Sequence, residues 1–238
     1  MNRVPTHIED LDRLLEGGIP EGSFVLISGP PGTMKTSLAY AILHENAVRG
    51  EKGLYVTMEQ SRGSLVTQMG LLGYPIKKAG GNLCVLDLAG LRKRLPASAG
   101  PPMPWVDLLK FYARGLRTSF DYGLLALDSL DALEIAANFE DIRRDVFDLV
   151  RWFRNLGCTY FAIAEAPGDS PANSGPGGHG SRREEYLADG IFHLRRARQG
   201  EFGAQRQLQV AKMRGTRHST SFHALLFENG FRLSPVLG

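Results

Sequence analysis

Apolar runs alternate with amphipathic segments through the first two thirds of this 238-residue chain, and that order constrains the fold more than any other feature. The runs are almost continuously apolar, as is typical of strands buried on both faces of a sheet. They cover residues 24–29, 53–59, 83–88, 123–129 and 158–165. Helical spacing is found at 35–50, 61–72, 104–119 and 139–157. Strands and helices in alternation predict an α/β fold with a mostly parallel central sheet flanked by helices.

The pattern changes after residue 190, where helical spacing ends. Strand-like segments joined by turns follow at 190–197, 206–213, 222–229 and 230–235. They predict antiparallel strands at the C-terminal edge of the sheet. Because no motif occurs twice, we predict one domain over residues 1–238. Two segments rich in Gly, Pro and Ser are predicted loops, at 92–104 and 167–181, either plain surface insertions or partner-contacting loops.

Composition and termini narrow the class of protein. Residues 1–10 lack the apolar core of a signal peptide, and no run of about 18 apolar residues occurs, so we expect a cytoplasmic protein with no membrane partner. Cys84 and Cys158 lie in apolar runs without metal-ligand spacing, which predicts buried free thiols. The formal charge of +3 is uneven, because residues 182–238 carry ten Lys or Arg against five Asp or Glu. The basic character therefore belongs to the C-terminal quarter.

The first apolar run leads into GPPGTMKTS (29–37), and a helical pattern begins at Lys35. A strand, a Gly-rich loop and a helix in this order form a phosphate-binding loop. Glycines let the backbone turn its N–H groups inward, Lys35 reaches the β- and γ-phosphates, and the Thr36 hydroxyl binds Mg²⁺. We therefore predict ATP and Mg²⁺ as cofactors. The predicted nucleotide-binding residues are Gly29, Pro30, Pro31, Gly32, Thr33, Met34, Lys35, Thr36 and Ser37.

Met34 stands where the usual pattern, Gly-x-x-x-x-Gly-Lys-Thr, has its second glycine. If the position takes a positive φ, a methionine there costs on the order of 1 kcal/mol. The donors of the loop are backbone N–H groups, which every residue except proline retains, and the methionine side chain can point away from the phosphates. We expect a working nucleotide site; the alternative is a decayed structural loop.

Two carboxylates at strand ends extend the loop into a candidate catalytic centre. Asp128 closes the run 123–129, where an aspartate can hold the Mg²⁺ water shell opposite Thr36. Glu59 closes the run 53–59, placed to orient or deprotonate an attacking water. Taken alone, Asp128 is more typical of a turn residue, and Glu59 is more typical of a solvated strand end. The phosphate loop is what favours the catalytic interpretation.

Five segments that follow one another along nearly the whole chain resemble the KaiC-like branch of the RecA-type ATPases. They are THIEDLDRLLEGGIPEGSFVLISGPPGTMKTSLA, GLYVTMEQS, LLALDSLDAL, EEYLADGIFHL and KMRGTRHS. The resemblance implies a RecA-like P-loop fold, with a helix before the phosphate loop and a turn at residues 17–20. It also implies that Lys212 and Arg214 reach the ATP bound by a neighbouring subunit. The predicted catalytic residues are therefore Lys35 and Glu59 of the subunit that binds the ATP, and Lys212 and Arg214 of its neighbour. Without the resemblance, KMRGTRH is typical of a solvated basic turn.

The sequence departs from the family at two places. Relatives carry two adjacent glutamates after the second strand, whereas this chain has Glu59 and Gln60, so hydrolysis is slow if the missing carboxylate is the base. Autophosphorylating relatives carry Ser and Thr before an aspartate, whereas Glu185 and Tyr186 precede Asp189 here, which disfavours self-phosphorylation. The clock protein of the family has two such domains, and a timekeeping role does not follow for a chain with one.

Three functions remain open. The first is an ATP-hydrolysing regulatory or motor-like subunit of a nucleotide-dependent ring, a homo-hexamer by resemblance, with a further protein partner that the sequence does not identify. The second is a switch that binds ATP with little turnover, which Met34 and Gln60 favour. The third is a DNA-acting recombinase-like ATPase, suggested by the fold and the basic C-terminal quarter. Nucleic acid is the less favoured partner because 167–181 lacks the cations that a phosphate-tracking surface needs.

Overall fold

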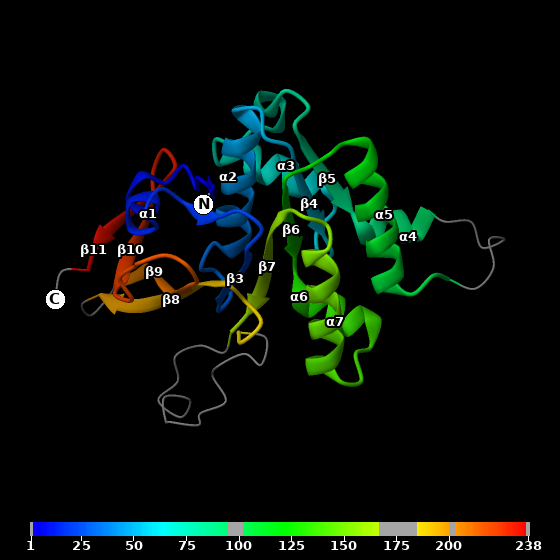
Figure 1. Cartoon of the computed structure of the whole chain (residues 1–238). Coiled ribbons are helices and arrows are strands. Elements are labelled where there is room, and N and C mark those ends of the chain that lie inside the picture. Colours follow the sequence, from blue (N-terminus) through cyan, green and yellow to red (C-terminus); the bar gives the residue numbers. More distant parts are fainter. Residues whose placement is uncertain (1, 95–101, 167–184, 200–202, 237–238) are drawn as a thin grey trace.

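A nine-stranded sheet forms the centre of the computed structural model, which describes residues 2–94, 102–166, 185–199 and 203–236 (Figure 1). The strand order is β11-β10-β9-β8-β3-β7-β6-β4-β5. The central strands are β3 (Phe24–Gly29), β4 (Gly53–Thr57), β5 (Leu83–Asp87), β6 (Leu124–Asp128) and β7 (Thr159–Glu165). The C-terminal strands are β8 (Gly190–Gln199), β9 (Gly203–Met213), β10 (Phe222–Phe227) and β11 (Phe231–Pro235).

In the sheet, the neighbours β5-β4, β4-β6, β6-β7, β7-β3 and β3-β8 pair in parallel. The neighbours β8-β9, β9-β10 and β10-β11 pair antiparallel. The mostly parallel sheet with antiparallel edge strands is therefore confirmed. One strand differs from the prediction: β8, expected to be antiparallel only, pairs in parallel with β3, from Val25 opposite Gly190 to Ser28 opposite His193. Only the first half of β8 is apolar, and this half pairs with β3, whereas the second half carries three arginines. No local pattern in such a strand shows which strands lie on its two sides.

Helices cover both faces of the sheet and enclose two hydrophobic cores (Figure 1). They are α1 (Glu9–Leu14), α2 (Lys35–Val48), α3 (Arg62–Leu71), the 3₁₀-helix η1 (Ile76–Ala79), α4 (Leu88–Arg94), α5 (Trp105–Ser119), α6 (Leu130–Ala137) and α7 (Ile142–Arg154). Helices α1, α2 and α3 contribute to one core, and α4 to α7 contribute to the other. Over the described residues, no helix combines the length and apolar character needed to cross a bilayer.

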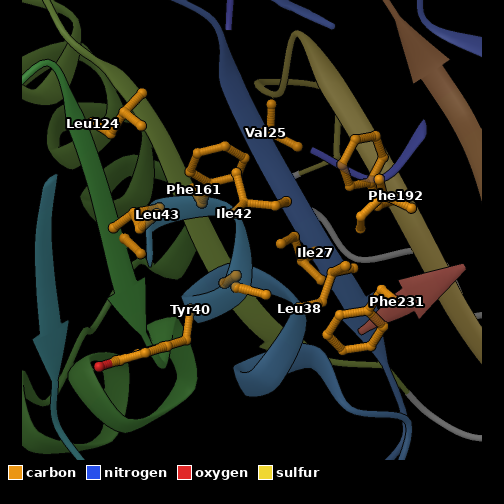
Figure 2. Close-up of a cluster of buried hydrophobic side chains, with 14 of the residues drawn as sticks. Val25, Ile27, Leu38, Tyr40, Ile42, Leu43, Leu124, Phe161, Phe192 and Phe231 are labelled. Carbon is orange, nitrogen blue, oxygen red and sulfur yellow. The ribbon is translucent and has the colours of Figure 1, made fainter. Parts of the chain in front are cut away.

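Helix α2 is apolar on most of its circumference, with buried side chains from Leu38 to Leu43, and a helix of this kind belongs inside a core. Figure 2 shows Leu38 and Ile42 facing Ile27 of β3 and Phe161 of β7. Because α2 begins directly after the phosphate loop, this packing holds the loop between a buried strand and a buried helix.

The segment before β3 forms the helix and turn that the resemblance implies. Strand β1 (Arg3–Val4) pairs with β2 (Ile19–Pro20), with α1 between them. The Arg3 guanidinium donates to the carbonyls of Leu15 and Gly18, both at 2.9 Å, and to Thr216 Oγ1 at 2.8 Å. The amino-terminal segment thereby reaches the basic turn that follows β9.

Several helices and loops begin or end at residues other than those predicted. The helix expected at 139–157 begins at Ile142, and the separate helix α6 precedes it. Residues 92–94 of one predicted loop belong to α4; residues 95–101, and the whole loop 167–181, lie outside the described residues. Both cysteines are free, but only Cys158 is buried, because Cys84 lies on β5 at the sheet edge and is half-buried.

Candidate nucleotide-binding site

The phosphate loop joins β3 to α2 at the carboxyl edge of the parallel strands. Gly32 has a φ of 79°, a left-handed conformation that glycine adopts without strain. A Cβ on Gly29 would collide with the carbonyl oxygen of Leu194 on β8, so the close approach of that strand requires glycine there. The Thr33 hydroxyl donates to the Pro30 carbonyl at 2.8 Å inside the loop. Turns of this kind present backbone N–H groups as an anion-binding concavity.

Met34 adopts a left-handed conformation, with φ of 70° and ψ of 29°, so the position of the second glycine does take a positive φ here. It is the N-cap residue of α2, and its carbonyl accepts from the Leu38 N–H at 2.9 Å. Its partly buried side chain packs against the core on the α2 face. Packing thus offsets part of the conformational cost, which for a residue other than glycine is about 1–2 kcal/mol.

Replacing Met34 by Gly should leave nucleotide affinity equal or higher, because the backbone donors remain and the left-handed strain disappears. We expect the free energy of unfolding to stay within about 1 kcal/mol of the parent, since the lost packing opposes the relief. Met34→Ala is the control, because it loses the same packing and keeps the strain, and it should be less stable than Met34→Gly. Calorimetric titration with nucleotide and thermal unfolding measure both effects; a large loss of affinity in Met34→Gly would contradict this account.

A cavity of about 350 Å³ lies beside the loop. It is lined by Pro31, Gly32, Met34, Lys35, Thr36, Glu59, Asp128, Ser129, Ile163, Glu165 and Arg206. The structure thus brings together loop residues, both predicted carboxylates and four residues that we did not predict, which are Ser129, Ile163, Glu165 and Arg206. The Lys35 ammonium donates to the carbonyls of Gly29 at 2.7 Å and Pro30 at 3.2 Å, which holds it at the mouth of the loop.

Asp128 ends β6 with only 7% of its surface exposed. Tyr55 Oη donates to its Oδ2 at 2.7 Å, and the Met58 N–H donates to its carbonyl at 2.7 Å. Burial raises the pKa of the Asp128 carboxyl above its ordinary value, while hydrogen bonds from Tyr55 and Thr36 lower it. Thr36 and Asp128, the two predicted metal-binding residues, line the same cavity.

The charges around the cavity suit a nucleotide that arrives with a divalent cation. Glu59, Asp128 and Glu165 face the two cations Lys35 and Arg206, a formal balance of −1 that a divalent cation would offset. The described residues contain no group of three side chains able to hold a metal alone. Mg²⁺ in nucleotide sites needs no such group, because phosphate oxygens and water complete its shell around one or two protein ligands.

Glu59 lies two residues beyond the end of β4, in the turn toward α3, rather than in the strand as predicted. It lines the cavity, and Ser129 Oγ donates to its Oε1. Gln60 is not among the described residues that line the cavity; its backbone N–H and carbonyl both pair with the Thr57 hydroxyl, at 3.2 and 2.9 Å. Gln60, which replaces the second glutamate of the family pattern, is therefore not part of the cavity wall.

Arg206 and Glu165 belong to the cavity and were missed in the sequence. Arg206 on β9 donates from Nε to the Gly32 carbonyl at 3.0 Å, opposite Arg196 in the β8–β9 pairing. The registers of β8 along β3 and of β9 along β8 together bring this pair beside the loop, and sequence patterns do not reveal them. Glu165 ends β7, and its N–H donates to Asp131 Oδ2 at 2.8 Å. The argument used for Asp128, a carboxylate at a strand end, would have found Glu165.

Lys212 and Arg214 lie near the amino-terminal end of β3, whereas the phosphate loop of the same chain follows its carboxyl end. Met213 pairs with Gly190, which lies opposite Val25 at the start of β3. At about 3.3 Å per residue, the loop beyond Gly29 is roughly 15 Å away along the strand. The structure therefore does not bring these two cations to the cavity.

Neighbouring groups hold the basic turn in place. Arg214 Nη1 pairs with Asp189 Oδ1 at 2.8 Å, and Asp189 also pairs with Arg154 at 3.2 Å. Lys212 Nζ donates to the Glu185 carbonyl at 3.4 Å, and burial, followed by the charge of Arg214, lowers the pKa of Lys212. The Arg214 side chain is 54% exposed, so it is accessible to another molecule.

The chain is similar to several known proteins. The family described as "ATPase: KaiC" matches residues 4–230. A UPF0273 protein of Thermotoga maritima is 30% identical over 251 residues, covering 100% of this chain and 98% of the relative. The circadian clock oscillator protein KaiC of Thermosynechococcus vestitus is 25% identical over 99% of this chain, which spans 45% of that protein. The crystal structure of the KaiC-like protein PH0186 from Pyrococcus horikoshii OT3 superposes with a TM-score of 0.81 at 28% identity, covering 98% and 99% of the two chains.

Proposed function

The chain belongs to the KaiC family of ATPases, and from that premise we propose that it binds ATP with Mg²⁺ and hydrolyses it as a subunit of a ring. It is a nucleotide-binding ATPase of the RecA and KaiC type. One observation carries the proposal: Lys35, Thr36, Glu59 and Asp128, from three separate parts of the chain, line the same cavity. Those side chains are the ones that phosphate binding, metal binding and water activation require.

Binding is assigned to the phosphate loop and its two cations. The loop N–H groups and the α2 amino terminus hold the phosphate oxygens, and Lys35 turns from the carbonyls of Gly29 and Pro30 toward them. Arg206, anchored on the Gly32 carbonyl, adds positive charge at the wall of the cavity. Mg²⁺, when bound, offsets phosphate charge. Thr36 and Asp128 are the residues that would hold it.

Hydrolysis is assigned to Glu59. Its carboxylate lines the cavity, and the hydrogen bond from Ser129 restricts its orientation, as a base that must face an attacking water requires. Because Gln60 lies away from the cavity wall, loss of the second glutamate leaves this base in place. That position favours hydrolysis over the alternative of a switch with little turnover. We do not assign self-phosphorylation, since Glu185 and Tyr186 occupy the positions of the acceptor residues.

Ring assembly follows from the position of the basic turn. Lys212 and Arg214 lie roughly 15 Å along the sheet from the loop of their own chain, so they can act on a nucleotide only if another subunit presents it. A homo-oligomer in which each basic turn meets a neighbouring cavity satisfies this requirement. A further protein partner remains open, and the loop 167–181, on which a DNA-binding role would depend, lies outside the described residues.

Lys35→Ala tests the proposed site. We expect calorimetry with ATP and Mg²⁺ to show an affinity at least about tenfold lower than the parent, because a charge-assisted contact to phosphate worth about 1.5–3 kcal/mol is lost. The matched control is Lys78→Ala, which removes the same charge from an exposed position on η1 and should bind normally. Equal affinity in the Lys35 variant and the parent would place the site elsewhere.

A further inference from the structure

A fully buried tyrosine reaches the predicted metal-binding aspartate from the neighbouring strand. Tyr55 lies in the middle of β4, between β5 and β6, with 0% of its surface exposed. Asp128 pairs with Thr57, and Tyr55 precedes Thr57 by two residues, so it lies on the same face of the strand. Its hydroxyl donates to Asp128 Oδ2 at 2.7 Å and lies 3.4 Å from the Thr36 carbonyl.

This hydrogen bond limits how the carboxylate can turn. A phenol has one proton, and the shorter distance assigns it to Asp128 Oδ2 rather than to the Thr36 carbonyl. A short hydrogen bond between buried groups restricts rotation of the carboxylate, because any other orientation leaves an unpaired oxygen in the core. Groups that hold a metal ligand in this way typically change metal affinity 10- to 100-fold when they are removed.

A second tyrosine in contact with the first provides the comparison. Tyr40 lies on α2, one turn after Thr36, is also 0% exposed, and its ring centroid is 5.5 Å from that of Tyr55. Its hydroxyl has no hydrogen-bond partner among the described residues. Figure 2 shows the Tyr40 side chain extending from α2 with its hydroxyl at the far end. The two rings are in contact in the same core, but only the Tyr55 hydroxyl forms a hydrogen bond with Asp128.

We propose that Tyr55 is a positioning residue for the metal–nucleotide site: its hydroxyl holds the Asp128 carboxylate in the orientation that supports a Mg²⁺ water shell. The inference rests on the proposed function, since it presumes nucleotide with Mg²⁺ in the cavity. It adds a role for a residue that lies outside the cavity and acts only through Asp128.

The test measures how much Mg²⁺ strengthens nucleotide binding. ADP is titrated calorimetrically into the full chain once with Mg²⁺ and once with a chelator, and the ratio of the two affinities is the metal-dependent gain. Tyr55→Phe should reduce this gain about 10-fold or more and leave the chelator affinity unchanged, because the phosphate loop is intact. Tyr40→Phe removes an equally buried hydroxyl and should keep the full gain.

Each outcome separates this inference from the proposed function. If the parent binds no nucleotide, the proposed function fails before the tyrosine is tested. A parent with a clear metal-dependent gain that Tyr55→Phe retains would overturn the role of Tyr55, and so would a variant that only melts at a lower temperature. A cycle with Asp128→Asn gives the second readout: the double variant should show the same gain as Asp128→Asn alone. A further loss in the double variant would show that Tyr55 does not act through Asp128.

Discussion

Glu59→Gln is expected to slow steady-state phosphate release by about 10² to 10⁴ while nucleotide affinity stays close to that of the parent. Glutamine has nearly the same shape and can still accept the hydrogen bond from Ser129, so the turn after β4 should remain in place. It cannot accept a proton from water near neutral pH, which is the property that a general base supplies. The loss should therefore appear in turnover and not in binding.

Gln60→Ala is the matched control for that variant. It alters the neighbouring residue in the same turn, and the backbone pairing of Gln60 with the Thr57 hydroxyl is retained. We expect phosphate release within a few-fold of the parent, because the Gln60 side chain does not line the described cavity. A normal rate in Glu59→Gln, or a collapse of the rate in Gln60→Ala, would transfer the catalytic role away from Glu59.

The sequence predicts the central part of the fold well, because strands buried on both faces must be apolar at every position. The burial of all six residues of β3 shows why its pattern was unambiguous. Short elements were harder to predict. Helix α6 has eight residues and begins directly after Asp128 and Ser129, too few turns to establish a period beside the longer α7. The parallel pairing of β8 depends on a neighbour 165 residues earlier, as in Ser28 opposite His193, and no local pattern records it.

The candidate site also contains residues that the sequence predicts and residues that it does not. Lys35, Thr36 and Asp128 were predictable because a phosphate loop and the carboxyl ends of parallel strands meet at one edge of the sheet. Arg206 was not, because its place depends on two successive strand registers, β3 with β8 and β8 with β9. Tyr55 is indistinguishable in the sequence from any aromatic residue in a buried strand. Its hydrogen bond becomes evident only when two strands are aligned.

Arg214→Ala is expected to reduce phosphate release by about 10³, at the lower end of what a trans-acting arginine contributes, and to leave ATP binding nearly intact. The side chain is 54% exposed, and its ion pair with Asp189 contributes little to stability. Asp189 retains Arg154 and the Phe24 N–H, so the fold should persist. Arg154→Ala is the matched control, since it removes the other cation from Asp189 and should cost far less activity if Arg214 itself reaches the phosphates.

Mixing two inactive variants tests whether Arg214 acts on a neighbouring subunit. Arg214→Ala subunits keep an intact phosphate loop, and Lys35→Ala subunits keep an intact basic turn, so a mixed ring contains junctions where the two intact halves meet. Phosphate release should then exceed the sum of the separate variants, and light scattering with ATP and Mg²⁺ should report mixed assemblies. Mixed assemblies without recovered activity would refute action in trans. A chain that stays monomeric at every nucleotide and protein concentration would remove the premise, because Lys212 and Arg214 would then have no phosphate within reach and the ATP-binding switch would become the better account of the cavity.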